Sequence, residues 1–161
     1  MPASLPATDA GKRSATPPAA PPGQPNLLRP TLALLAGLGI TILTIGLGVV
    51  IATLAALRGV DPRQFVATPG YLVVVTAINL AGTMLGGFTT ARVTTGRSFF
   101  TVQLLALVMV TSGVAQSLKS GVKPGEPGWY PIALALVGGA GALVGGLLER
   151  RAEAARRATV A

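Results

Sequence analysis

The stretch PTLALLAGLGITILTIGLGVVIATLAAL, Pro30–Leu57, contains no charged residue and is bounded by Arg29 and Arg58. At about 1.5 Å per residue, a helix of this length exceeds the roughly 30 Å hydrocarbon core of a bilayer, so it has to tilt or protrude. A cleaved signal peptide is the competing interpretation, because ATLAAL (Ala52–Leu57) offers small residues of the kind that signal peptidase accepts. The apolar run is too long for a signal peptide, and its leading tail is too extended. The stretch therefore predicts a membrane-spanning helix.

Three further apolar segments follow, at Tyr71–Ala91, Phe99–Leu118 and Pro131–Leu148. Each is close to the roughly 20 residues that a helix needs to cross a bilayer. Over the whole chain of 161 residues, 50% are hydrophobic and only 11% are charged, which is too apolar for an ordinary soluble domain. The sequence predicts an all-α, polytopic membrane protein with a bundle of four transmembrane helices within residues 30–149.

The regions outside the spans differ in composition from the spans. Residues 1–29 are rich in Pro and Ala and predict a disordered tail, and residues 150–161 form a basic C-terminal tail. The segment VDPRQF after the first span favours a short interfacial helix, because Asp61 precedes Pro62 and Gln64 follows three residues after the Asp. Only RVTTGRS separates the second span from the third, which predicts that these two helices are antiparallel neighbours.

The positive charges indicate an orientation, because Lys and Arg concentrate on the cytoplasmic side of a membrane. Nine of the 13 Lys and Arg residues fall on the side of the two termini: Lys12, Arg13, Arg29, Arg92, Arg97, Arg150, Arg151, Arg156 and Arg157. We therefore expect a multi-pass protein of the bacterial inner (plasma) membrane with both termini in the cytoplasm, the bias toward Ala, Gly and Arg being typical of GC-rich codons. Tyr71, Trp129 and Tyr130 then form an aromatic belt at the outer interface.

The second and fourth spans contain similar glycine-rich stretches. NLAGTMLGGFTTAR (Asn79–Arg92) and GGAGALVGGLLERR (Gly138–Arg151) share the pattern AGxxxGGxxxxR. The abundance of Gly and Ala favours such matches by chance, but the similarity also includes turn and interface residues upstream of the helices. We interpret the chain as two related hairpins, 30–91 and 99–151, repeated in parallel about an axis normal to the membrane.

Small residues let helices approach closely in lipid, where association lacks the hydrophobic drive that it has in water. The glycines of both stretches therefore predict helix packing, most simply of the second span against the fourth, and otherwise within a homodimer. The predicted packing residues are Gly82, Gly86, Gly87, Gly138, Gly141, Gly145 and Gly146. The same alignment predicts an interfacial ion pair between Arg92 and Glu149.

Asn79, Gln103 and Gln116 are the amide side chains within the spans. Each is able to form a hydrogen bond between helices, with a contribution of about 0.6–2 kcal/mol, or to line a polar path for a solute. We favour the first role, because the spans contain no Asp, Glu, Lys, Arg or His of the kind that proton relays and ion-coupled sites use.

Several kinds of chemistry have no basis in the sequence. The chain has no Cys and no His, which excludes disulfides, imidazole catalysis and the usual zinc sites. Ser112 and Ser117 have no His or Lys base in the spans to activate them, so we expect neither an enzyme nor a cofactor. The net charge of +8 lies in tails and turns, where it meets anionic lipid rather than nucleic acid.

Two classes of function stay open on the sequence. The first is a structural, accessory or assembly protein that acts through glycine-mediated packing, in a homo-oligomer or a larger membrane complex. The second is a small oligomeric channel or carrier for an uncharged or weakly polar solute. Asn79→Leu and Gln103→Leu distinguish the two classes, since we expect these replacements to abolish transport but to leave an accessory protein assembled.

Overall fold

The computed structural model describes residues 28–59, 61, 65–94, 99–120 and 124–160, and this part of the chain is helical apart from its connections. The helices are α1 (Leu28–Ala56), α2 (Pro69–Val93), α3 (Phe99–Ser120) and α4 (Tyr130–Val160). Each is long and apolar enough to cross a membrane, as a multi-pass membrane protein requires. The helical class and the four helices of spanning length predicted from the sequence are confirmed. Residues 1–27 and the core of VDPRQF, at 62–64, lie outside the described residues.

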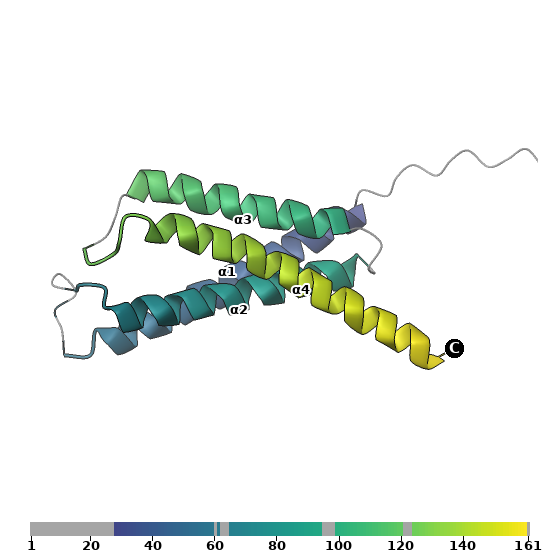
Figure 1. Ribbon diagram of the computed structural model, residues 1–161, viewed down its shortest axis with the longest axis horizontal. Helices are drawn as coiled ribbons and strands as arrows, with labels where there is room; N and C mark the ends of the chain where they lie inside the picture. Colours follow the sequence, from purple (N-terminus) through teal and green to yellow (C-terminus); the bar gives the residue numbers. More distant parts are fainter. Residues whose placement is uncertain (1–27, 60, 62–64, 95–98, 121–123, 161) are drawn as a thin grey trace, which may run out of the picture.

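The helix ends follow from local chemistry. Thr68 is the N-cap of α2, with its hydroxyl accepting a hydrogen bond from the Tyr71 amide at 3.3 Å, and Pro69 occupies the first helical position. Helix α4 differs from the expected boundary, because it does not end at Leu148 but continues to Val160. Ala and Arg are good helix formers, and Arg157 pairs with Glu153 one turn earlier. The end of α4 therefore projects beyond the bundle (Figure 1).

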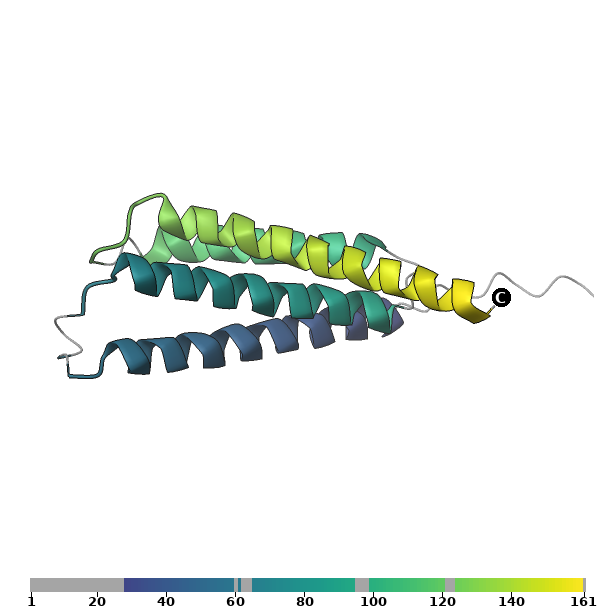
Figure 2. The same ribbon diagram turned by 60° about the horizontal axis from the view of Figure 1, so that its bottom comes forward.

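Each of α2 and α4 packs against two other helices. Helix α2 lies between α1 and α4, and α4 lies between α2 and α3, so that α2 and α4 run parallel and side by side (Figure 2). Helices α2 and α3 run antiparallel, as expected, but α3 packs chiefly against α4 and makes few contacts with α2. Gly139 and Gly146 of α4 provide the physical reason, since their bare backbones admit Val110 and Val102 of α3.

The bundle has two different ends. We name the "connection end" after the α1–α2 and α3–α4 connections that meet there, and the "tail end" after the C-terminal extension of α4 at the opposite side (Figure 1). At the connection end the Ala67 amide donates a hydrogen bond to the Pro124 carbonyl at 3.2 Å. Gly125 follows with a φ of 84°, and a Cβ there would lie 2.8 Å from the Ala67 carbonyl oxygen. Glycine is thus required for the two connections to pack together.

The exterior and interior of the bundle suit a lipid environment. Large apolar side chains face outward, among them Leu43 at 70% and Leu118 at 81% exposed. The interior is made largely of small residues, and Leu105 and Val102 are the largest side chains that are fully buried among the described residues. Packing between the helices therefore depends on close backbone approach.

Candidate functional site

The contact between α1 and α2 is built on a reciprocal pair of small residues. Gly37 and Thr41 of α1 face Gly86 and Thr90 of α2, and a Cβ on either glycine would lie 2.8 Å from the carbonyl oxygen of the other. The Thr41 hydroxyl donates to the Gly37 carbonyl at 2.8 Å, and the Thr90 hydroxyl donates to the Gly86 carbonyl at 2.9 Å. Each hydroxyl is thus satisfied by its own helix, and the two backbones meet without an unpaired polar group.

The contact between α2 and α4 uses glycines from both helices. A Cβ on Gly87 would lie 2.7 Å from the Ala142 carbonyl carbon, and one on Gly145 would lie 2.8 Å from the Met84 carbonyl carbon. Gly138 faces Asn79, and Gly141 faces Thr83. At these positions α2 and α4 are in backbone contact.

The helices α2 and α4 thus pack together as predicted, but three of the seven predicted glycines lie at other contacts. Gly82 and Gly86 pack against α1, where Ile45 and Thr41 fill the space, and Gly146 packs against Val102 of α3. Neighbouring residues of a helix are turned by about 100°, so the adjacent glycines of a GG pair serve two different partners. All seven predicted packing glycines lie against another helix of the same chain.

The residues matched in the repeat have different surroundings. Gly82 lies against α1, whereas Gly141, its counterpart, lies against α2. Gly87 lies against α4, whereas Gly146 lies against α3. Parallel hairpins related by a twofold axis would give each pair equivalent neighbours, so the repeat stays a prediction from the sequence.

A cavity of about 380 Å³ lies between α2, α3 and α4 in the half of the bundle near the connection end. This volume is within the range of about 300–1,000 Å³ that small-molecule sites occupy. Apolar side chains such as Val75 and Leu134 form part of its wall. Its polar lining consists of Tyr71, Asn79, Thr83, Ser112, Gln116, Ser117, Glu126 and Tyr130.

The spreading of the helices explains where the cavity is. Near the tail end Leu34 and Leu38 of α1 pack against the buried cluster of Leu105, Ala106 and Ala142, which brings α1 close to α3. Toward the connection end α1 and α3 diverge, as Figures 1 and 2 both show. Helix α1 contributes no residue to the lining, so the cavity is bounded by the other three helices and by Glu126 of the α3–α4 connection.

Part of the polar lining has unused hydrogen-bonding capacity. The Asn79 Nδ2 donates to the Leu134 carbonyl at 2.9 Å, which fixes the amide and leaves Oδ1 without a donor among the described residues. Thr83 and Ser117 donate to carbonyls of their own helices at 2.8 Å. The side chains of Ser112 and Gln116 make no hydrogen bond within the described part of the chain. An amide without a partner in hydrocarbon costs several kcal/mol, so these groups need water or a polar ligand in a membrane.

Two tyrosines that line the cavity also link helices at the connection end. The Tyr130 hydroxyl donates to the Leu72 carbonyl at 2.9 Å and lies 3.1 Å from the Thr76 hydroxyl, which links α4 to α2. The Tyr71 hydroxyl lies 3.0 Å from the Thr53 hydroxyl, which links α2 to α1. Sequence reasoning assigned both rings to an interfacial belt and missed this bridging role.

The structure separates the three predicted amides. Asn79 and Gln116 line the cavity, whereas Gln103 lies outside it, although Gln103 and Gln116 are both exposed on α3. Ser112 and Glu126 are lining residues that the sequence did not single out for this role. Glu126 lies in a loop rich in Gly and Pro, and no local pattern signals that this loop closes over a cavity.

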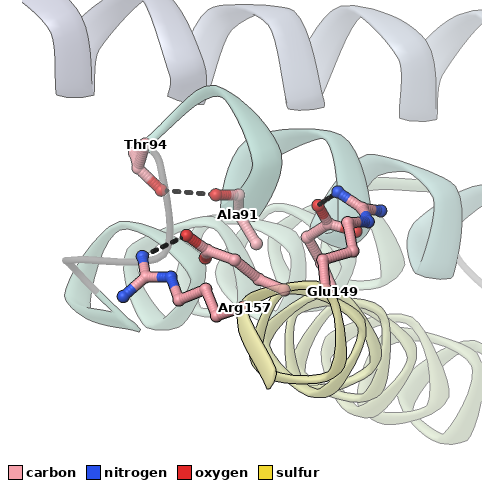
Figure 3. Close-up of polar contacts among 6 residues, drawn as sticks. Ala91, Thr94, Glu149 and Arg157 are labelled. Carbon is pink, nitrogen blue, oxygen red and sulfur yellow. Dashed lines mark hydrogen bonds and ion pairs between the residues drawn. The ribbon is translucent and has the colours of Figure 1, made fainter. Parts of the chain in front are cut away.

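The predicted ion pair between Arg92 and Glu149 is not formed. Arg92 is exposed, and Glu149 is paired instead with Arg156 of its own helix, with Nη1 and Oε1 3.6 Å apart. Glu149 lies among the buried residues at 3% exposure, and its Oε2 has no hydrogen-bond partner. The continuation of α4 beyond Leu148 is the reason for the difference, because it brings Arg156 back two turns later on the same face. Figure 3 shows Glu149 and Arg157 on α4, with Ala91 and Thr94 of the end of α2 nearby.

Comparison of the chain with protein-family models, with curated proteins and with solved structures finds no match.

Proposed function

We propose that the protein is a small membrane carrier and that the cavity between α2, α3 and α4 is its solute site. The observation that supports this function is the set of hydrogen-bonding groups without partners in the lining: the Asn79 Oδ1 and the side chains of Ser112 and Gln116. Such groups recognise a small polar solute by hydrogen bonds in a site that is otherwise apolar.

The proposal includes an orientation in the inner membrane. We place the connection end outside and both termini in the cytoplasm, because nine of the 13 Lys and Arg residues fall on the side of the termini. The cavity then opens toward the outer half of the bilayer. The chain has no native cysteine, so single cysteines at Gly128 and Thr159 are suitable reporters. A membrane-impermeant maleimide should label intact spheroplasts only at position 128, and labelling only at position 159 would reverse the orientation.

Uptake into proteoliposomes tests the carrier. The purified protein is reconstituted and assayed with labelled urea, glycerol and choline against protein-free liposomes. We expect uptake of at least one solute, and we expect Asn79→Leu and Gln116→Leu to lower that uptake by roughly tenfold, as the loss of one hydrogen bond of about 1.4 kcal/mol implies.

Gln103→Leu is the matched control, because it removes an amide from the same helix as Gln116 but outside the cavity. Its uptake should equal that of the unmodified protein. Uptake no faster than in protein-free liposomes, or equal losses in all three variants, would refute a solute site in this cavity.

An accessory or assembly role is the second candidate. Helix α1 supports it, because Gly39 and Gly46 are exposed on this helix with nothing within 4 Å of the Cβ that a substitution would add. If α1 docks a partner helix there, Gly39→Leu with Gly46→Leu should release a co-purifying chain without unfolding the bundle. Purification of a lone chain under gentle conditions would count against this role.

A further inference from the structure

One carboxylate lines the described part of the cavity, and it comes from the α3–α4 connection and not from a helix. Glu126, in the α3–α4 connection, is half-buried and is the only acidic or basic side chain among the described residues of the lining. The fold determines its place, since Gly125 packs onto the Ala67 backbone and Pro124 accepts the hydrogen bond from the Ala67 amide. A negative charge is therefore placed at the connection end of a cavity whose other described lining residues are neutral.

The rest of the lining also suits a positively charged ligand. The Asn79 Nδ2 donates a hydrogen bond to the Leu134 carbonyl, so the Oδ1 is left as an acceptor for a ligand. Tyr71 and Tyr130 contribute to the wall at the same end as Glu126, and their hydroxyls are engaged with other helices. Aromatic rings attract cations, and this attraction grows when the cation is desolvated.

We propose that the ligand of this cavity carries an ammonium group, which lies against Glu126 and the tyrosines while the remainder of the ligand reaches toward Asn79. This inference rests on the proposed function and gives its solute a chemical class. It departs from the uncharged solute expected from the sequence, because the acid comes from a loop and not from a span. Attraction between the ammonium and a half-buried carboxylate is stronger than in bulk water, whereas an anion would be repelled.

Two matched probes test the charge. Choline and its uncharged isostere 3,3-dimethylbutan-1-ol have nearly the same shape, and their affinities are measured by calorimetry on the full chain in dodecyl maltoside. We expect choline to bind at least roughly tenfold more tightly than the alcohol, which corresponds to about 1.4 kcal/mol. Glu126→Gln should bring the affinity of choline closer to that of the alcohol, with the tyrosines accounting for any preference that remains. It should leave the affinity of the alcohol unchanged, which also verifies that the variant is folded.

Lys119→Gln is the control for a general effect of surface charge. Lys119 lies in the last turn of α3, at the connection end like Glu126, but it does not line the cavity. Its neutralisation should therefore alter choline affinity by no more than about twofold. Equal affinities of choline and the alcohol, or an unchanged ratio in Glu126→Gln, would overturn the ammonium ligand while leaving a carrier of neutral solutes in place. Failure of both probes to bind, together with no uptake of urea or glycerol, would overturn both proposals.

The ammonium has two sources, a soluble amine or the ethanolamine headgroup of a lipid. Choline binding is therefore repeated in nanodiscs of phosphatidylglycerol with and without phosphatidylethanolamine. Loss of choline binding in the presence of phosphatidylethanolamine would assign the site to the headgroup, and unchanged binding would assign it to a soluble amine. Either result retains the ammonium class. Absence of choline binding in both kinds of nanodisc would contradict it.

Discussion

The two halves of the bundle are joined by different means. Near the tail end the helices meet through bare backbone, as at Gly86 against Gly37 and Gly145 against Met84. Near the connection end they are bridged by long side chains, with the Tyr71 and Tyr130 hydroxyls reaching Thr53 and Thr76. Backbone contact leaves little space between helices. The cavity lies in the half that the two tyrosines bridge, and both tyrosines line it.

Substitution at the glycine contact between α2 and α4 should give the largest change in unfolding free energy. Gly145→Ala places a methyl group 2.8 Å from the Met84 carbonyl carbon, so α2 and α4 must separate. Overpacking of this kind costs about 1–3 kcal/mol of unfolding free energy. Reversible unfolding in mixed detergent and SDS micelles, followed by circular dichroism, measures the loss.

Gly46→Ala is the control for the same substitution in a helix. Nothing lies within 4 Å of the added methyl group, so this variant should gain roughly 0.5–1 kcal/mol from helix propensity. If Gly145→Ala were no less stable than Gly46→Ala, backbone contact would not be what holds the tail half together.

Loss of the Tyr130 hydroxyl, which links α4 to α2, should give an intermediate change in unfolding free energy. Tyr130 is buried at 8% exposure, and Tyr130→Phe removes the hydroxyl bonded to the Leu72 carbonyl and placed beside Thr76. Hydrogen bonds between membrane helices contribute about 0.6–2 kcal/mol, and we expect a loss of this size. Hydrogen exchange should accelerate in the first turns of α2 and α4 and stay unchanged near Gly87 and Gly145. Uniform acceleration along both helices would mean that the two halves unfold as one unit.

The sequence predicted the helices well because the determinants of a spanning helix are local. The composition of Pro30–Leu57 alone predicts a helix long and apolar enough to span a membrane, and Thr68 with Pro69 marks the start of α2. The end of α4 was missed because the polar segment after Leu148 looked like a tail, although its Ala and Arg residues favour helix.

The site was predicted only in part, because it depends on which helices become neighbours. Asn79 and Gln116 were recognised as polar residues in spans, but nothing in the sequence distinguished them from Gln103, which lies outside the cavity. Gly82 and Gly87 were assigned to one stripe, although a rotation of about 140° between them on the helix directs them to different partners. Glu126 joins the cavity only through the packing of two loops that are distant in the sequence.

The smallest effect on stability concerns Glu149, the buried acid of the tail half among the described residues. Glu149 is 3% exposed, its Oε2 has no hydrogen-bond partner, and Arg156, at a distance of 3.6 Å, is largely exposed. The free-energy cost of desolvating a buried carboxylate often exceeds the gain from its attraction to a partner. Arg156 is exposed, so water solvates its guanidinium when the acid is removed. Glu149→Leu should therefore leave the unfolding free energy unchanged or raise it by up to about 1 kcal/mol. The control Glu153→Ala, which breaks the exposed pair with Arg157, should lower it by roughly 0.3–0.5 kcal/mol. A clear destabilisation by Glu149→Leu would mean that a group outside this chain satisfies the carboxylate, and the tail half would then be a binding surface as well as a packing contact.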